Sequence, residues 1–161
     1  METQFIETIS KHQGIIHKVC SMYIDTEEDR RDLFQEILIQ LWKAYPGFRH
    51  ESKITTWMYR VALNTAISMF RKQSRKPKST SFSNTLFQIP DTTYDYEFEE
   101  KVKVLKEAIN KLSKIERAIM MLYLEDSTYE EIADTIGITQ NYVRVKMNRI
   151  KNKLKKMLTK Q

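Results

Sequence analysis

Side chains able to read DNA bases recur on one face of a helical pattern near the C-terminus. Asn141, Val145 and Asn148 follow one another at helical spacing, and Arg144 and Arg149 flank them. Asn can bond the edge of adenine, Arg the edge of guanine, and Val can touch a thymine methyl group in the major groove. An outward-facing Val suits such a groove better than it suits water. The pattern therefore predicts a DNA-reading helix.

The surrounding segment is strongly cationic. Residues 137–161 carry eight Lys and Arg and no Asp or Glu, in a chain of 161 residues with a formal net charge of +6. Two predicted helices, Thr128–Ile136 and Thr139–Leu158, are joined by Gly137, as in a helix-turn-helix whose second helix enters the major groove. A solvated basic helix without a DNA partner is the alternative, and it does not account for the preceding helix and turn.

A second group of cations is interleaved with aromatic residues in the first half of the chain. Aromatic rings stack on unpaired bases while cations neutralise phosphates, so this composition is typical of surfaces that bind single-stranded nucleic acid. Taken singly, helical Trp residues more often lie in a core. We expect Trp42 to be core and Trp57 to lie at its margin. The candidate residues are Arg49, Lys53, Trp57, Tyr59, Arg60, Asn64 and Arg71.

A third candidate surface follows the polar face of the predicted helix that ends before Pro46. Ile39 is the informative residue, because it lies about 200° around the helix from the core position Ile37 and has polar neighbours. A single exposed Ile is common in soluble proteins, so the residue alone is weak evidence for an interface. The face comprises Asp32, Gln35, Glu36, Ile39 and Lys43.

The sequence gives no support to an enzyme or a metalloprotein. It contains neither a phosphate-binding G-x-x-x-x-G-K-[ST] loop nor an H-E-x-x-H motif. His12, His17 and His50 show no ligand spacing with the single Cys20. We therefore expect no catalytic residue, metal, cofactor or small-molecule substrate. With one cysteine and no apolar run near 18 residues, we also expect a cytoplasmic protein without membrane insertion.

The elements that must position these residues are all helices. Apolar residues recur at intervals of three and four, and only three Gly and three Pro occur. The periodicity fails in the middle of the chain, which predicts two small helical domains joined by a flexible linker. We assign 1–76 to the first domain, 77–97 to the linker and 98–161 to the second domain. In the second domain, Ser113 with Glu116 and Thr128 with Glu131 form capping-box patterns that mark two helix starts.

Several strings in both halves resemble one known family, the extracytoplasmic-function sigma factors. In the first half, the strings similar to conserved region 2 of that family are Asp32–Trp42, Tyr45–Arg49 and Trp57–Asn64. In the second half, Leu112–Leu158 resembles conserved region 4, with Tyr129–Ala133 and Val143–Arg149 as its clearest strings. Both halves in this order are far more specific than either half alone.

The resemblance implies a bacterial sigma factor that directs core RNA polymerase to specific promoters and assists promoter melting. It assigns polymerase binding to the Asp32–Lys43 face and the minus-ten element to the loop and helix from Arg49 to Arg71. It further implies an anti-sigma partner. It places the minus-thirty-five element on the last helix, at Gln140, Asn141, Arg144, Val145, Lys146, Asn148 and Arg149.

The alternative is a stand-alone helix-turn-helix regulator that binds duplex DNA. That interpretation shares the C-terminal evidence, but it leaves unexplained the exposed Ile39 and the interleaved cations and aromatic residues of the first half. The sequence also lacks the heptad pattern that a coiled-coil dimer would need.

Overall fold

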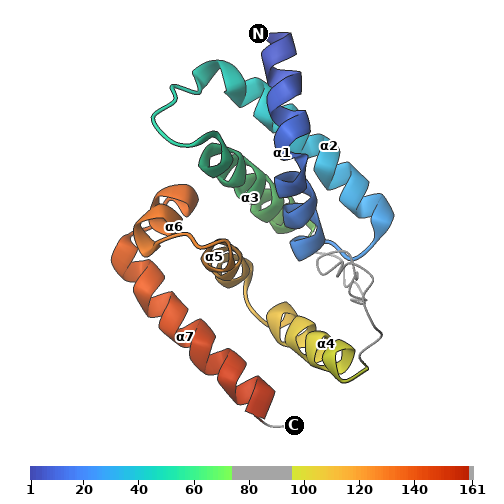
Figure 1. The fold of residues 1–161 in the computed structure, drawn as a ribbon, viewed down its shortest axis with the longest axis vertical. Coiled ribbons are helices and arrows are strands. Elements are labelled where there is room, and N and C mark those ends of the chain that lie inside the picture. Colours follow the sequence, from blue (N-terminus) through green and yellow to red (C-terminus); the bar gives the residue numbers. More distant parts are fainter. Residues whose placement is uncertain (74–95, 160–161) are drawn as a thin grey trace. The chain divides into compact units, whose positions relative to one another are not determined.

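The computed structural model describes residues 1–73 and 96–159, and all regular elements in these ranges are helices, as predicted (Figure 1). The chain divides into two compact units, whose described parts we call the N-unit (1–73) and the C-unit (96–159). Nearly all of the predicted linker 77–97 lies outside the described residues, and residues 96 and 97 already belong to a helix. The elements are α1 (Glu2–Tyr23), α2 (Glu27–Ala44), the 3-10 turn η1 (Tyr45–Gly47), α3 (Ile54–Gln73), α4 (Tyr96–Asn110), α5 (Lys114–Leu124), α6 (Tyr129–Ile136) and α7 (Gln140–Thr159).

The N-unit is a three-helix bundle in which α3 packs against both α1 and α2 (Figure 1). Thr26 caps α2 by accepting a hydrogen bond from the Asp29 backbone N–H, and Pro46 in η1 ends that helix. The fully buried side chains that close the bundle are Ile16, Val19, Leu33, Ile37, Leu41 and Met58, with Leu63 1% exposed.

The two tryptophans of the N-unit exchange the roles predicted for them. Trp42 is 41% exposed and Trp57 is 9% exposed, so the prediction of a core Trp42 and a marginal Trp57 is wrong. Leu41, the neighbour of Trp42, takes the core position on α2, which turns the Trp42 ring toward the bundle edge. Trp57 is covered by rings that come from outside its helix, Tyr45 and Phe48.

The C-unit is built around α7, which packs against α4, α5 and α6. Both predicted capping boxes are confirmed, with Ser113 and Glu116 at the start of α5 and Thr128 and Glu131 at the start of α6. Gly137 ends α6 with a left-handed φ of +83°, a conformation that glycine adopts without steric cost. Two helices and a glycine turn therefore form the predicted helix-turn-helix from α6 and α7.

Candidate nucleic-acid interface

The predicted DNA-reading residues of α7 share one exposed face, with a single exception. Val143, Met147 and Ile150 turn the opposite face into the core of the C-unit. Thr139 accepts a hydrogen bond from the Tyr142 backbone N–H at 3.1 Å and so fixes the first turn of the helix. The predicted residues that are exposed are Gln140, Asn141, Arg144, Val145, Asn148 and Arg149.

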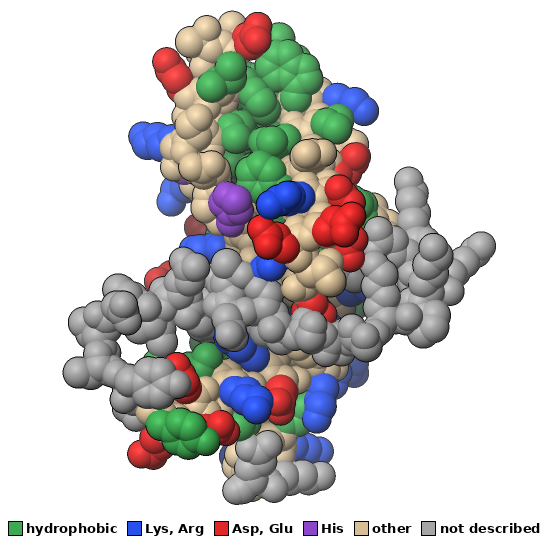
Figure 2. Space-filling model, turned by 90° about the vertical axis from the view of Figure 1, so that its right-hand side faces the viewer, with side chains coloured by type: hydrophobic (Ala, Val, Ile, Leu, Met, Phe, Trp, Pro, Cys, Tyr) green, Lys and Arg blue, Asp and Glu red, His purple; other side chains and the backbone are tan. Residues whose placement is uncertain are grey.

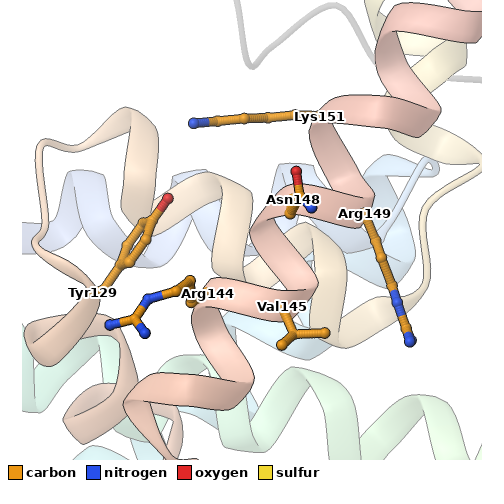
Figure 3. A pocket seen from close by; sticks show the side chains of 6 residues that line it. All are labelled: Tyr129, Arg144, Val145, Asn148, Arg149 and Lys151. Atoms are coloured by element: carbon orange, nitrogen blue, oxygen red, sulfur yellow. The ribbon is translucent and has the colours of Figure 1, made fainter.

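An open groove of about 460 Å³ follows this face (Figure 3). Tyr129, the first residue of α6, lies beside Arg144 on one side of α7, whereas Arg149 extends from the other side. Three of the six lining side chains are cationic and none is acidic, so the groove suits a polyanion. Tyr129 is absent from the predicted DNA-binding residues, because it belongs to the preceding helix. The groove is lined by Tyr129, Arg144, Val145, Asn148, Arg149 and Lys151.

Lys146 is the exception, because its side chain lies away from this exposed face. Its side chain is 22% exposed, and its Nζ lies 4.0 Å from a carboxylate oxygen of Glu116 on α5. The same ammonium lies 5.6 Å from the centre of the Tyr142 ring. Lys146 therefore turns toward α5 and not into the groove.

Glu116 ties the start of α5 to α7. This carboxylate is almost fully buried and accepts hydrogen bonds from Lys153 Nζ at 2.8 and 3.1 Å and from the Ser113 backbone N–H at 3.0 Å. Burial alone would raise the pKa of the Glu116 carboxyl. The hydrogen bonds from Lys153 and Ser113, with the charges of Lys153 and Lys146, outweigh burial and hold that pKa below its ordinary value.

The lowered pKa of Glu116 predicts that the C-unit loses stability in acid. The contribution is fully present above the unfolded-state pKa, close to the ordinary value of 4.5, and is lost as pH falls through the lower folded pKa. We expect Glu116→Gln to flatten the fall in the free energy of unfolding below pH 4.5. Urea unfolding of both proteins at several pH values measures this difference. Parallel curves would show that the carboxylate contributes no pH dependence.

The predicted face of α2 is assembled on the surface of the N-unit. Asp32, Gln35 and Lys43 are exposed, and Ile39 is 46% exposed. Glu36 is half-buried, and its Oε1 accepts a hydrogen bond from Gln40 Nε2 at 2.7 Å. Figure 2 shows apolar side chains gathered on one face of this unit. The exposed apolar side chains of α1 and α2 are Ile6, Ile39 and Trp42.

The structure separates the predicted base-stacking residues from the predicted cations. Trp57 and Tyr59 are 9% and 7% exposed, so their rings belong to the core and offer no face for an unpaired base. A stacking role for either ring would require it to become exposed. Arg71 lies in the last turn of α3, whose side chains fall outside the described residues. Of the remaining candidates, Arg49, Lys53 and Asn64 are exposed and Arg60 is half-buried.

Within the described ranges, no cluster of His, Cys, Asp and Glu could hold a metal ion. No helix of 1–73 or 96–159 has the length and apolar character needed to cross a membrane. Burial raises the pKa of the Cys20 thiol to about 12, so this thiol is protonated at neutral pH and is a poor nucleophile.

Comparison with known proteins shows which family this chain resembles. Residues 8–76 match sigma-70 region 2, and residues 103–154 match sigma-70 region 4. The chain is 27% identical to the ECF RNA polymerase sigma factor SigG of Mycobacterium tuberculosis over 84% of its length, but spans only 43% of that relative. It is 25% identical to the RNA polymerase sigma factor SigV of Bacillus subtilis, over 97% of this chain and 92% of SigV.

Two solved structures share the fold. One is the sigma factor RpoE of Bartonella quintana in complex with the anti-sigma factor NepR. Its TM-score is 0.71 at 18% identity, over 98% of this chain and 96% of RpoE. The other is CnrH in complex with the cytosolic domain of CnrY, with a TM-score of 0.70 at 16% identity, over 100% of this chain and 91% of the matched chain.

Proposed function

This chain belongs to the extracytoplasmic-function group of the sigma-70 family, and we propose that it directs core RNA polymerase to specific promoters and assists their melting. The observation that carries the proposal is the acid-free cationic groove on α7, whose Asn, Val and Arg side chains offer the contacts that distinguish base pairs in a major groove. In this proposal α7 reads the minus-thirty-five element, and residues 98–161 form the domain that carries it.

The N-unit supplies the other two contacts in this proposal, with residues 1–76 as its domain. The α2 face with Ile39 at its centre binds polymerase. Arg49, Lys53 and Asn64, with Arg60 beside them, bind the backbone of the minus-ten element as it opens. Because the Trp57 and Tyr59 rings are buried, in this proposal they pack beneath the surface residues and do not stack on bases.

We further propose that an anti-sigma protein regulates the chain in the cytoplasm. The support is that one structural neighbour, the sigma factor RpoE, was solved in complex with the anti-sigma factor NepR. The other, CnrH, was solved in complex with the cytosolic domain of CnrY.

Reconstitution with core polymerase tests the proposed function. We expect the purified chain to co-elute with core polymerase and to start transcription at a defined promoter selected from genomic DNA. The alternative, a stand-alone regulator, predicts site-specific binding to duplex DNA without polymerase. Specific duplex binding combined with no co-elution would favour that alternative.

Substitutions in α7 should separate base reading from phosphate binding. Arg144→Ala or Asn148→Ala should cost about 1 to 3 kcal/mol of binding on the native upstream element and relax the preference at particular base positions. Arg149→Ala and Lys151→Ala should weaken all sequences alike and lower the log-log salt slope by about 0.9 per contact. Selection of bound sequences from randomised elements at two salt concentrations measures both effects.

Lys146→Met is the matched control for these cation substitutions. It removes a positive charge from the same helix but from the side that faces Glu116. We expect an unchanged salt slope. If Arg144→Ala lowered affinity for all sequences equally and left their ranking intact, α7 would serve as an electrostatic anchor only.

A further inference from the structure

Six aromatic rings form a continuous chain of contacts through the N-unit. Successive centroids are 5.0, 5.3, 6.1, 5.1 and 4.5 Å apart. These separations lie in the range of favourable aromatic pairs. In order of contact the rings are Trp42, Phe5, Tyr45, Trp57, Phe48 and His50.

The last ring of the chain belongs to an exposed loop, residues 49–53, between η1 and α3. Phe48 is half-buried and lies on the buried Trp57, and His50 is exposed and lies on Phe48. The Phe48 backbone N–H donates to the Tyr45 carbonyl at 3.1 Å, which fixes the entry into the loop. The rings thus connect the loop to the core of the bundle.

The backbone of His50 is in the left-handed region, with φ at +58°. Residues other than glycine rarely adopt this region, and they remain there only when contacts with their surroundings stabilise it. The ring contact between Phe48 and His50 is an interaction of this kind, and it acts at the strained residue itself.

We propose that Phe48 and Trp57 are positioning residues that hold loop 49–53, through His50, in the shape that engages the minus-ten element. This inference rests on the proposed function. It gives Trp57 a role from within the core, since its ring is covered and the cations Arg49 and Lys53 of the loop are exposed. The ring of His50 transmits the position of Phe48 to the loop backbone.

Phe48→Leu tests the proposal, because it removes the ring and keeps an apolar side chain. In the reconstituted holoenzyme we expect promoter opening to be about twofold to tenfold slower, which is the effect of losing one aromatic pair. Permanganate reactivity of promoter thymines measures the rate of opening. Closed-complex affinity and co-elution with polymerase should be unchanged. In the free protein, amide hydrogen exchange at residues 49–53 should be faster, and Phe48→Tyr should restore both measurements.

The chain offers a matched control in a second Phe–His pair. Phe34 of α2 is half-buried and its ring lies 4.7 Å from that of the exposed His17, so Phe34→Leu makes the same chemical change away from the loop. For Phe34→Leu we expect promoter opening and hydrogen exchange in loop 49–53 at wild-type rates. An equal effect of Phe34→Leu on opening would overturn the proposal, because the effect of Phe48→Leu would then reflect general weakening of the bundle.

His50→Ala keeps the proposal testable if Phe48→Leu does not fold, because it removes only an exposed ring. Positioning predicts slower opening together with faster exchange in the loop. Slower opening with unchanged exchange would mean that His50 touches DNA directly, and normal opening would mean that the ring does nothing; either result overturns the proposal. Failure of the wild-type chain to bind polymerase would refute the proposed function separately, whatever the loop exchange shows.

Discussion

We expect Ile39→Glu combined with Gln35→Ala to abolish binding to core RNA polymerase and to leave the chain folded. Ile39 is 46% exposed at the centre of the α2 face. The other side of α2 packs into the core of the bundle through Leu33, Ile37 and Leu41. A charge at the centre of an apolar contact should cost a few kcal/mol of binding, as at interface hot spots. Co-elution on a sizing column measures binding, and circular dichroism measures folding.

Ile6→Glu is the control for this double variant. Ile6 is an isoleucine of α1 that is 55% exposed, so the substitution places the same charge on the same unit but on a different helix. We expect it to retain polymerase. If the Ile39 variant still co-eluted with polymerase, the α2 face would lose its assigned role and the family resemblance would no longer locate the polymerase contact.

Local signals explain why the helices could be predicted closely from the sequence. The predicted helices Thr128–Ile136 and Thr139–Leu158 agree to within one residue at each end with α6 and α7. Capping boxes at Ser113 and Thr128 placed the starts of α5 and α6, because each box involves residues only three positions apart. The exposed face of α7 followed in the same way from helical periodicity.

Contacts between different elements of the fold account for the errors in the predicted positions of side chains. The marginal position predicted for Trp57 is wrong because the pattern of its own helix does not include the Tyr45 and Phe48 rings. These rings come from the preceding turn and cover Trp57. Lys146 looks like a DNA contact for the same reason, since its partner Glu116 lies on another helix. A buried Glu that caps α5 and also binds Lys153 is not visible in a pattern of spacings.

Glu116→Ala should lower the free energy of unfolding of the C-unit by about 2 to 4 kcal/mol. The carboxylate is only 2% exposed and serves two interactions, the cap of α5 and the ion pair with Lys153 at 2.8 Å. Loss of a cap costs about 1 kcal/mol, and removal of one partner of a buried ion pair costs more. We place the total below the full cost for a buried pair, because Lys153 is half-exposed and can return to water.

Glu131→Ala is the matched control, because Glu131 closes the second capping box and is exposed. It should cost only the cap, about 1 kcal/mol. Both tryptophans, Trp42 and Trp57, lie in the N-unit, so tryptophan fluorescence follows that unit while far-UV circular dichroism follows all helices. In urea, Glu116→Ala should move the dichroism transition of the C-unit and leave the fluorescence transition in place. Equal losses for Glu116→Ala and Glu131→Ala would show that the bond to Lys153 adds no stability, and that the recognition helix is held by its apolar face alone.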